Sequence, residues 1–310
     1  MRVIQGTTQF KLEQGQRSVV AIGKFDGMHK GHQRLLQELF KYRDLGLQTV
    51  ILTFDASFST FLGNKPQRDL TTKEEKRQIF EAMGIDVLVE FPINETTIAM
   101  KPELFVSEIL TKQLQAKQIV AGTDLSFGDQ GAGNIALLNR MAVQGDYGVS
   151  IIEKVCYERT EISSTYVRDE VEKRKMQLVT KLLGYPYSIS GVVQQGRRIG
   201  RTLEMPTVNL QPTENKLLPP NGVYFSYLIY QGNYYKGLTN IGCKPTVTQE
   251  KTVLVETYIY NFEKDIYGEP VTVQLLTFRR PEVRFADLAA LKAQIQKDKE
   301  AGELYFAVQG

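Results

Sequence analysis

The feature that most constrains the fold is a glycine-rich stretch of ten residues, Gly23–His32, which reads Gly-Lys-Phe-Asp-Gly-Met-His-Lys-Gly-His. An apolar run, Val19–Ile22, precedes it, and an amphipathic run, Leu35–Phe40, follows it. This order predicts a buried strand, a tight turn and a helix. A helix N-terminus presents unpaired backbone N–H groups and the positive end of the helix dipole, so the turn is a candidate phosphate site.

The same stretch contains both histidines of the chain, His29 and His32. Two imidazoles at a helix start would add side-chain donors for one anion. Glycines 23, 27 and 31 would let the backbone approach a ligand without a Cβ in the way. A lone histidine in such a turn more often caps or packs, but two at this spacing favour a phosphate site.

Composition restricts the class of protein. A chain of 310 residues suits two domains, and its net charge of +3 is too small to indicate nucleic acid. Cys156 and Cys243 are far apart and have no metal-ligand spacing, so we expect free thiols and a cytoplasmic protein. No signal-peptide core and no apolar run of roughly 18 residues is present, so we expect no membrane span. The sequence gives no indication of an oligomeric state.

The first half alternates between strand and helix patterns, which predicts an α/β fold with a parallel sheet covered on both faces. A capping-box pattern, Thr72–Glu75, marks one helix start. The expected strands are residues 19–22, 49–54, 87–91, 118–121 and 150–152. The expected helices follow residue 32, the capping box, Pro102 and Asn134. In such sheets ligands bind at the carboxyl ends of the strands, where Gly23–His32 falls.

Two further loops are expected at that edge of the sheet. Gly122–Gly128 reads Gly-Thr-Asp-Leu-Ser-Phe-Gly, and by itself it is most simply a connecting turn with packed Leu125 and Phe127. Ser163–Arg168 reads Ser-Ser-Thr-Tyr-Val-Arg and opens a helix, so a capping serine and a solvated arginine would also explain it.

The second half changes to a period of two, which predicts antiparallel strands. The expected strands are residues 187–193, 222–230, 234–241, 253–260 and 271–278. Leu288, Leu291 and Ile295 then predict a closing amphipathic helix. This pattern suggests a small closed β-barrel. We place the boundary near residue 185, which gives domains at residues 1–184 and 185–310.

A basic, glycine-bearing stretch, Gly196–Leu210, opens this second half. It could be a solvated hairpin loop. It could also meet RNA, but no platform of alternating basic and stacking aromatic residues accompanies it.

The stretches Gly23–His32, Gly122–Gly128 and Ser163–Arg168 resemble, in this order, three signatures of the prokaryotic bifunctional riboflavin kinase/FMN adenylyltransferase (FAD synthetase) family. The resemblance implies a Rossmann-like nucleotidylyltransferase domain. It implies that His29, His32 and Arg168 are catalytic and stabilise phosphate charge. The implied ATP contacts are Gly23, Phe25, Asp26, Gly27, Gly31, Asp124, Ser164 and Thr165.

Gly196–Leu210 resembles the riboflavin kinase signature of the same family. The resemblance implies a β-barrel kinase domain whose ATP contacts are Gly196, Gly200, Thr207 and Asn209. Thr207 and Asn209, two apart in a strand, would also share Mg²⁺. The segment Glu256–Gly268 continues the resemblance, with Glu256 as the base for the ribityl hydroxyl. The segment Phe278–Pro281 resembles the family's flavin-side segment only loosely, and this resemblance implies a flavin contact for Arg279.

The sequence departs from the family at three places. Asp55 is followed by Ala-Ser-Phe where the family has Pro-His-Pro. Glu204 and Met205 replace Gly-Phe in the kinase signature, and Tyr258 and Asn261 replace His and Asp. The first change leaves the shape of its loop open but does not touch the histidine pair, and the bulkier, acidic Glu204 could alter the kinase loop.

The expected function is therefore phosphorylation of riboflavin by Mg-ATP to FMN, followed by transfer of AMP from ATP to FMN, which gives FAD and pyrophosphate. The expected partners are these small molecules, without nucleic acid or membrane. Two alternatives remain at this point. One is another nucleotidylyltransferase whose second half only binds substrate, and the other is a non-catalytic flavin- or RNA-binding protein.

Overall fold

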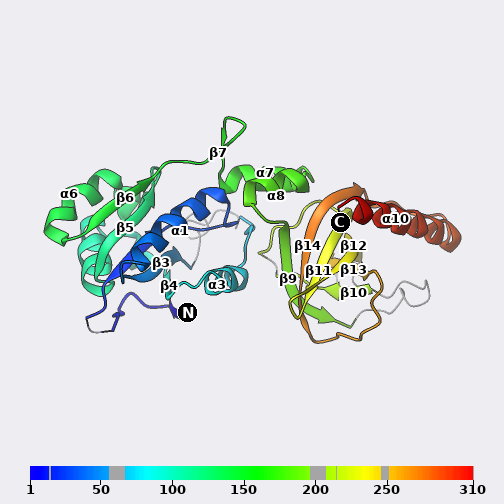
Figure 1. Cartoon of the computed structure of the whole chain (residues 1–310), viewed down its shortest axis with the longest axis horizontal. Coiled ribbons are helices and arrows are strands. Elements are labelled where there is room, and N and C mark those ends of the chain that lie inside the picture. Colours follow the sequence, from blue (N-terminus) through cyan, green and yellow to red (C-terminus); the bar gives the residue numbers. More distant parts are fainter. Residues whose placement is uncertain (14, 56–66, 196–206, 214, 246–250, 310) are drawn as a thin grey trace. The chain divides into compact units, whose positions relative to one another are not determined.

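The computed structural model describes residues 1–13, 15–55, 67–195, 207–213, 215–245 and 251–309. The chain divides into two compact units, Met1–Ser164 and Thr165–Gly310 (Figure 1). Gly196, Gly200, Glu204 and Met205 lie outside the described residues, as does the segment after Asp55 where the sequence departs from the family. No helix in the described residues is long and apolar enough to cross a membrane.

The first unit is built on a six-stranded sheet in which every described pair is parallel. The strand order is β1-β4-β3-β2-β5-β6. The strands are β1 Arg2–Gln5, β2 Ser18–Ile22, β3 Gln48–Phe54, β4 Val87–Phe91, β5 Ala116–Gly122 and β6 Gly148–Ile152. Residues of β2 and β4 are buried on both faces, as expected for a parallel sheet covered by helices. The predicted α/β class is confirmed.

The strand order explains where a ligand would bind in this unit. From β2 the chain adds β3 and β4 on one side, and later adds β5 and β6 on the other side. The connections therefore leave in opposite directions from β2 and β5, and the carboxyl ends of these two strands form the topological switch point at which such sheets bind ligands. Gly23–His32 follows β2 and Gly122–Gly128 follows β5, so both loops lie at this switch point.

The helices of the first unit match most of the predicted positions. They are α1 Lys30–Arg43, α3 Lys73–Ala82, α4 Glu95–Ile98, α5 Pro102–Leu104, η1 Phe105–Gln113, a 3₁₀ turn η2 Asp129–Gly131 and α6 Ile135–Gly145. The capping box is present, since Thr72 Oγ1 accepts from the Glu75 N–H while the Glu75 carboxylate accepts from the Thr72 N–H.

The helix expected after Pro102 is present at the predicted position, but most of it is not an α-helix. Only its first turn, α5, is an α-helix, and η1 is a π-helix. Its end shows the wider spacing, because the Leu114 N–H donates to the Ile109 carbonyl, five residues back. Apolar spacing alone does not distinguish the two, since both bury Phe105, Val106, Ile109 and Leu110.

Several short elements were not predicted. β1 pairs with β4 at the edge of the sheet. A short hairpin, β7 Cys156–Tyr157 with β8 Thr160–Glu161, follows β6. α4 is a single capped turn. Each is four residues or fewer, too short for a periodic pattern to show.

The second unit is a closed six-stranded barrel of order β10-β13-β12-β11-β14-β9, which confirms the predicted barrel. Its strands are β9 Tyr187–Gln194, β10 Thr207–Leu210, β11 Gly222–Tyr230, β12 Asn233–Pro245, β13 Lys251–Ile259 and β14 Pro270–Arg280. Two helices, α7 Ser164–Glu172 and α8 Met176–Leu183, lead into it, and α10 Leu288–Gln309 closes it. In Figure 1, α10 (red) lies along one side of the barrel.

Burial separates the two faces of the barrel strands. Ser226, Thr239 and Thr257 are fully buried and form a chain of hydroxyl contacts of 2.7 and 2.8 Å. The alternate residues of the same strands include Phe225, Leu238 and Tyr258, which pack with Phe306 of α10. The face that carries Tyr258 is therefore the outer one, partly covered by α10.

We expect Thr72→Ala to destabilise the first unit by about 1 kcal/mol, because α3 loses its N-cap acceptor. Urea unfolding would measure the loss of stability, and hydrogen exchange would measure it separately at the Glu75 amide. Thr72→Ser keeps the hydroxyl and serves as the matched control. Equal stability of the alanine and serine variants would contradict the proposed contribution of the cap.

Candidate active sites

The loop between β2 and α1 is fastened to the start of α3. The Gly27 N–H donates to Thr71 Oγ1 at 2.8 Å, and the Thr71 N–H donates to Asp26 Oδ1 at 3.0 Å. Phe80, on α3, contacts Phe25 edge-to-face at 5.6 Å between centroids. The loop is thus bound to α3 through both polar and aromatic contacts, and the Asp26 carboxylate accepts one of the hydrogen bonds that hold it there.

The loop is also held in a conformation that most residues avoid. Phe25, Gly27 and Met28 have φ values of 51°, 82° and 42°. Phe25 and Met28 are fully buried, so their side chains hold the left-handed backbone in place. Such conformations cost roughly 1–3 kcal/mol each for non-glycine residues and gather at functional sites.

Two of the glycines make room for rings. A Cβ at Gly31 would lie 3.1 Å from two atoms of the His29 imidazole, and a Cβ at Gly23 would lie 3.3 Å from the Phe25 ring. Besides the close approach of a ligand, which the sequence led us to expect, these glycines allow the rings to pack against the backbone.

His29 and His32 stack on each other, with ring centroids 3.7 Å apart and planes inclined by 21°. His29 is the N-cap residue of α1, and Phe25 flanks His32 at 5.2 Å. Burial lowers the pKa of His29 to about 4, against an opposing effect of Asp124. The pKa of His32 is lowered well below 6.5 by burial, and further by His29 and Lys76. Both imidazoles are therefore neutral at pH 7.

In the described part of the chain, the Nδ1 atoms of His29 and His32 are buried without a hydrogen-bond partner. Unpartnered buried polar atoms are uncommon, and they point to a missing ligand or to a catalytic role. Neutral imidazoles with lowered pKa values are weak bases at pH 7 but can still donate one N–H each.

Asp124 lies on the loop after β5, close enough to His29 to influence its pKa. Its exposed carboxylate is 3.6 Å from Lys154, which also pairs with Glu161 at 2.8 Å. Phe127 of the same loop is buried in the core, and Leu125 packs against that core, as the simpler interpretation of this loop expected.

The third predicted loop also reaches the phosphate loop. Ser164 Oγ donates to the Asp26 carbonyl at 2.9 Å, and the Ile162 carbonyl lies near Gly31. The structure thus brings Asp26, Ser164 and the histidine loop together. Thr165 and Arg168 follow Ser164 in α7, and both belong to the second compact unit.

Strand register gathers the predicted kinase residues on the outer face of the barrel. Asn209 of β10 lies directly opposite Glu256 of β13, and Asn240 of β12 lies opposite Glu256 on its other side. Directly opposed residues of antiparallel strands share a face. Thr207, two residues from Asn209, is on the same face and opposite Tyr258.

Comparisons with known proteins identify the family of this chain. Family models for FAD synthetase and for riboflavin kinase match residues 11–166 and 183–306. The bifunctional riboflavin kinase/FMN adenylyltransferase of Listeria monocytogenes is 34% identical, over 93% of this chain and 92% of the relative. That of Buchnera aphidicola subsp. Schizaphis graminum is 36% identical, over 99% of both chains.

The chain belongs to the bifunctional riboflavin kinase/FMN adenylyltransferase family. The expected family, with its two transferase activities in one chain, is thereby confirmed. A crystal structure from Streptococcus pneumoniae, named as that of a macrolide-efflux protein, shares the fold with a TM-score of 0.82. It is 29% identical and covers 94% of this chain and 95% of its own.

The kinase part of this family member has a candidate metal ligand. Asn209 is buried, and in the described residues its Oδ1 has no hydrogen-bond partner. An amide oxygen beside the Glu256 carboxylate and the Thr207 hydroxyl fits the oxygen-ligand preference of Mg²⁺. These residues therefore suit the ion that the resemblance implies.

Arg279 has a partner within the protein. Its Nε lies 3.6 Å from Asp298 Oδ1, while Arg280 Nε lies 2.8 Å from Asp298 Oδ2. Asp298 is buried on α10, so the two arginines attach that helix to β14. Contact of Arg279 with flavin stays a prediction.

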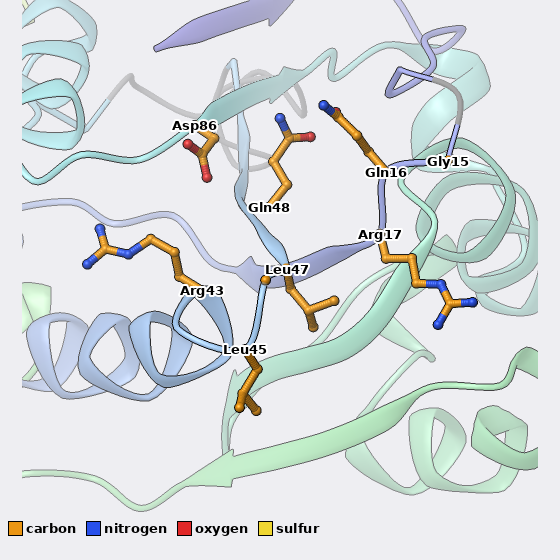
Figure 2. A pocket seen from close by; sticks show the side chains of 9 residues that line it. Gly15, Gln16, Arg17, Arg43, Leu45, Leu47, Gln48 and Asp86 are labelled. Carbon is orange, nitrogen blue, oxygen red and sulfur yellow. The ribbon is translucent and has the colours of Figure 1, made fainter.

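A polar hollow of about 600 Å³ lies near the amino ends of β2, β3 and β4 in the first unit (Figure 2). Its lining includes Arg17 before β2, Gln48 at the start of β3 and Asp86 before β4. Arg17 and Arg43 point away from each other in Figure 2, so they do not form an anion clamp. The hollow is thus separate from the switch point between β2 and β5.

Sequence reasoning missed several residues next to these sites. Thr71 binds the loop, Lys76 and Lys154 are cations near it, and Asn240 adjoins Glu256. The signals were weak. Thr71 directly precedes the recognised capping box, and Asn240 lies in a recognised segment, but only strand register and helix packing reveal their neighbours.

Because the chain has only two histidines, their titration can be followed directly by NMR. We expect neither imidazole to titrate near pH 6.5, and His29 to stay neutral down to pH 5. Because the folded-state pKa of His29 is lowered, its contribution to stability is fully present above pH 6.5 and is lost as the pH falls towards 4. For His29 the loss by pH 5 is about 2 kcal/mol. An imidazole that titrates at pH 6.5 would contradict the buried, neutral pair.

Proposed function

We propose that residues 1–184 transfer AMP from ATP to FMN, and that residues 185–310, which contain the barrel, phosphorylate riboflavin to FMN. The observation that carries the first assignment is the stack of two neutral, buried imidazoles at the switch point of a parallel sheet. The pairing of Asn209 with Glu256 supports the second.

In adenylyl transfer, an oxygen of the FMN phosphate attacks the α-phosphorus of ATP, and the bond to the β-phosphate oxygen breaks, releasing pyrophosphate. The nucleophile is already an anion, so no side-chain base is needed. His29 and His32 donate N–H groups to phosphate oxygens, and Arg168 with Thr165 adds donors from the start of α7. The low pKa of His29 supports this role, since a base with a pKa of about 4 accepts protons poorly at pH 7.

In riboflavin phosphorylation, the ribityl hydroxyl attacks the γ-phosphorus of ATP, and ADP leaves. Glu256 accepts the hydroxyl proton, and Thr207 with Asn209 orients the phosphates. Thr207 and Asn209 would hold Mg²⁺, which would supply charge neutralisation at the phosphates. Gly196 and Gly200 would cover them, on the predicted family pattern.

We place the functional boundary at residues 184 and 185. The match to FAD synthetase ends at residue 166, and the match to riboflavin kinase begins at residue 183, which supports a boundary at the end of α8. On this proposal α7 and α8 belong functionally to the adenylyltransferase, although the compact units divide at Ser164. We also propose a cytoplasmic location, from the sequence alone.

Gly31→Ala tests the histidine stack. The new Cβ would push the His29 ring out of its place by a few tenths of an ångström. Since a small misplacement in an active site can cost up to about 10²-fold, we expect FMN adenylylation to fall by roughly tenfold or more. Riboflavin phosphorylation should be unchanged. A Gly191→Ala variant, whose new Cβ would make only an ordinary contact with Leu210 at 3.4 Å, controls for the loss of a glycine.

The two-site assignment predicts separable losses. The double variant His29→Ala with His32→Ala should stop FAD formation from FMN and leave riboflavin phosphorylation intact. Glu256→Ala should do the reverse, with a loss of roughly 10²–10⁴-fold. The assay is chromatography of FMN, FAD and pyrophosphate after incubation with ATP, Mg²⁺ and either flavin.

Wild-type protein that converts neither flavin would refute the proposed function. A folded single-site variant that loses both activities would refute the separation of the sites.

A further inference from the structure

The helix α3 is bound to the phosphate loop through Thr71 and Phe80. α3 carries three cations, Lys73, Lys76 and Arg77. Arg77 is committed to Glu90, with contacts of 2.6 and 2.9 Å, and it also binds Gln5. Lys73 is exposed at the first position of the helix. Only Lys76 influences the histidine pair, since it lowers the pKa of His32.

Helix geometry directs Lys76 towards the loop. Lys76 precedes Phe80 by four residues, so the two share a face of α3. Phe80 packs on Phe25, and Phe25 in turn contacts His32. Side chains on a helix lean towards its N-terminus. Here the N-terminal end is the one that Thr71 bonds to Gly27.

Lys76 is half-buried, and within the described residues its ammonium has no carboxylate within ion-pair distance. The contrast with Lys154 is informative, because Asp124 and Glu161 both pair with that lysine. A half-buried cation without an anion, beside two neutral N–H donors and a helix N-terminus, is suited to a polyphosphate.

We propose that Lys76 binds the triphosphate of ATP in the adenylyl-transfer site and holds the pyrophosphate that leaves. This rests on the proposed function of the first unit. Lys76 supplies positive charge that the neutral histidines do not.

Lys76→Gln keeps a good helix former and removes the charge. We expect the KM for ATP in FMN adenylylation to rise roughly tenfold or more, from loss of a charge-assisted hydrogen bond. The KM for ATP in riboflavin phosphorylation should not change. Inhibition of adenylylation by inorganic pyrophosphate should weaken by a similar factor, and Lys76→Arg should restore part of both. Lys73→Gln, one turn earlier on the exposed face, is the matched control and should behave as wild type.

Direct binding separates this proposal from the proposed function. Calorimetric titration of Mg-pyrophosphate into wild type, Lys76→Gln and Lys73→Gln measures affinity without turnover. Weaker binding only in Lys76→Gln supports the assignment. Equal affinity and equal KM for the two glutamine variants would overturn it, even if the wild-type protein makes FAD. Wild-type protein that makes no FAD would instead refute the function of the site.

Discussion

The stack of His29 on His32 is the interaction on which the first site depends. Two imidazoles 3.7 Å apart would repel each other if both were protonated, and burial removes the water that would screen them. The fold therefore keeps both neutral, at a cost in stability at acid pH. The loop that carries this pair is held by the hydrogen bonds between Gly27, Thr71 and Asp26 and by the buried Phe25 side chain. The absence of a Cβ at Gly31 leaves room for the His29 ring.

The second site depends on strand register in a closed barrel. Glu256 has Asn209 on one side and Asn240 on the other because β13 lies between β10 and β12. A slip by one residue would exchange this polar row for Val255 and Thr257, which are fully buried on the opposite face. The hydroxyl chain of Ser226, Thr239 and Thr257 inside the barrel opposes such a slip, since those groups would lose their partners.

Much of this architecture follows from the sequence, for identifiable reasons. Strong periodicity predicted the parallel sheet and the barrel, and the Thr72–Glu75 capping box predicted the start of α3. Elements of four residues or fewer, such as β1, carry too little pattern to be recognised. Of the site, the motif residues could be predicted because their chemistry is local. Lys76 and Thr71 could not, because their relation to the loop arises only when α3 packs on Phe25.

The charge distribution around the histidines has a consequence for how an anion is bound. With neutral rings, the positive charge near the stack comes from the N-terminus of α1, from Lys76 and from Lys154, while Asp124 on the His29 side pairs with Lys154 and offsets its charge. A polyphosphate would thus be drawn towards the Lys76 side of the stack. This distribution of charge orients the polyphosphate before it contacts either imidazole, because charge acts over a longer range than a hydrogen bond.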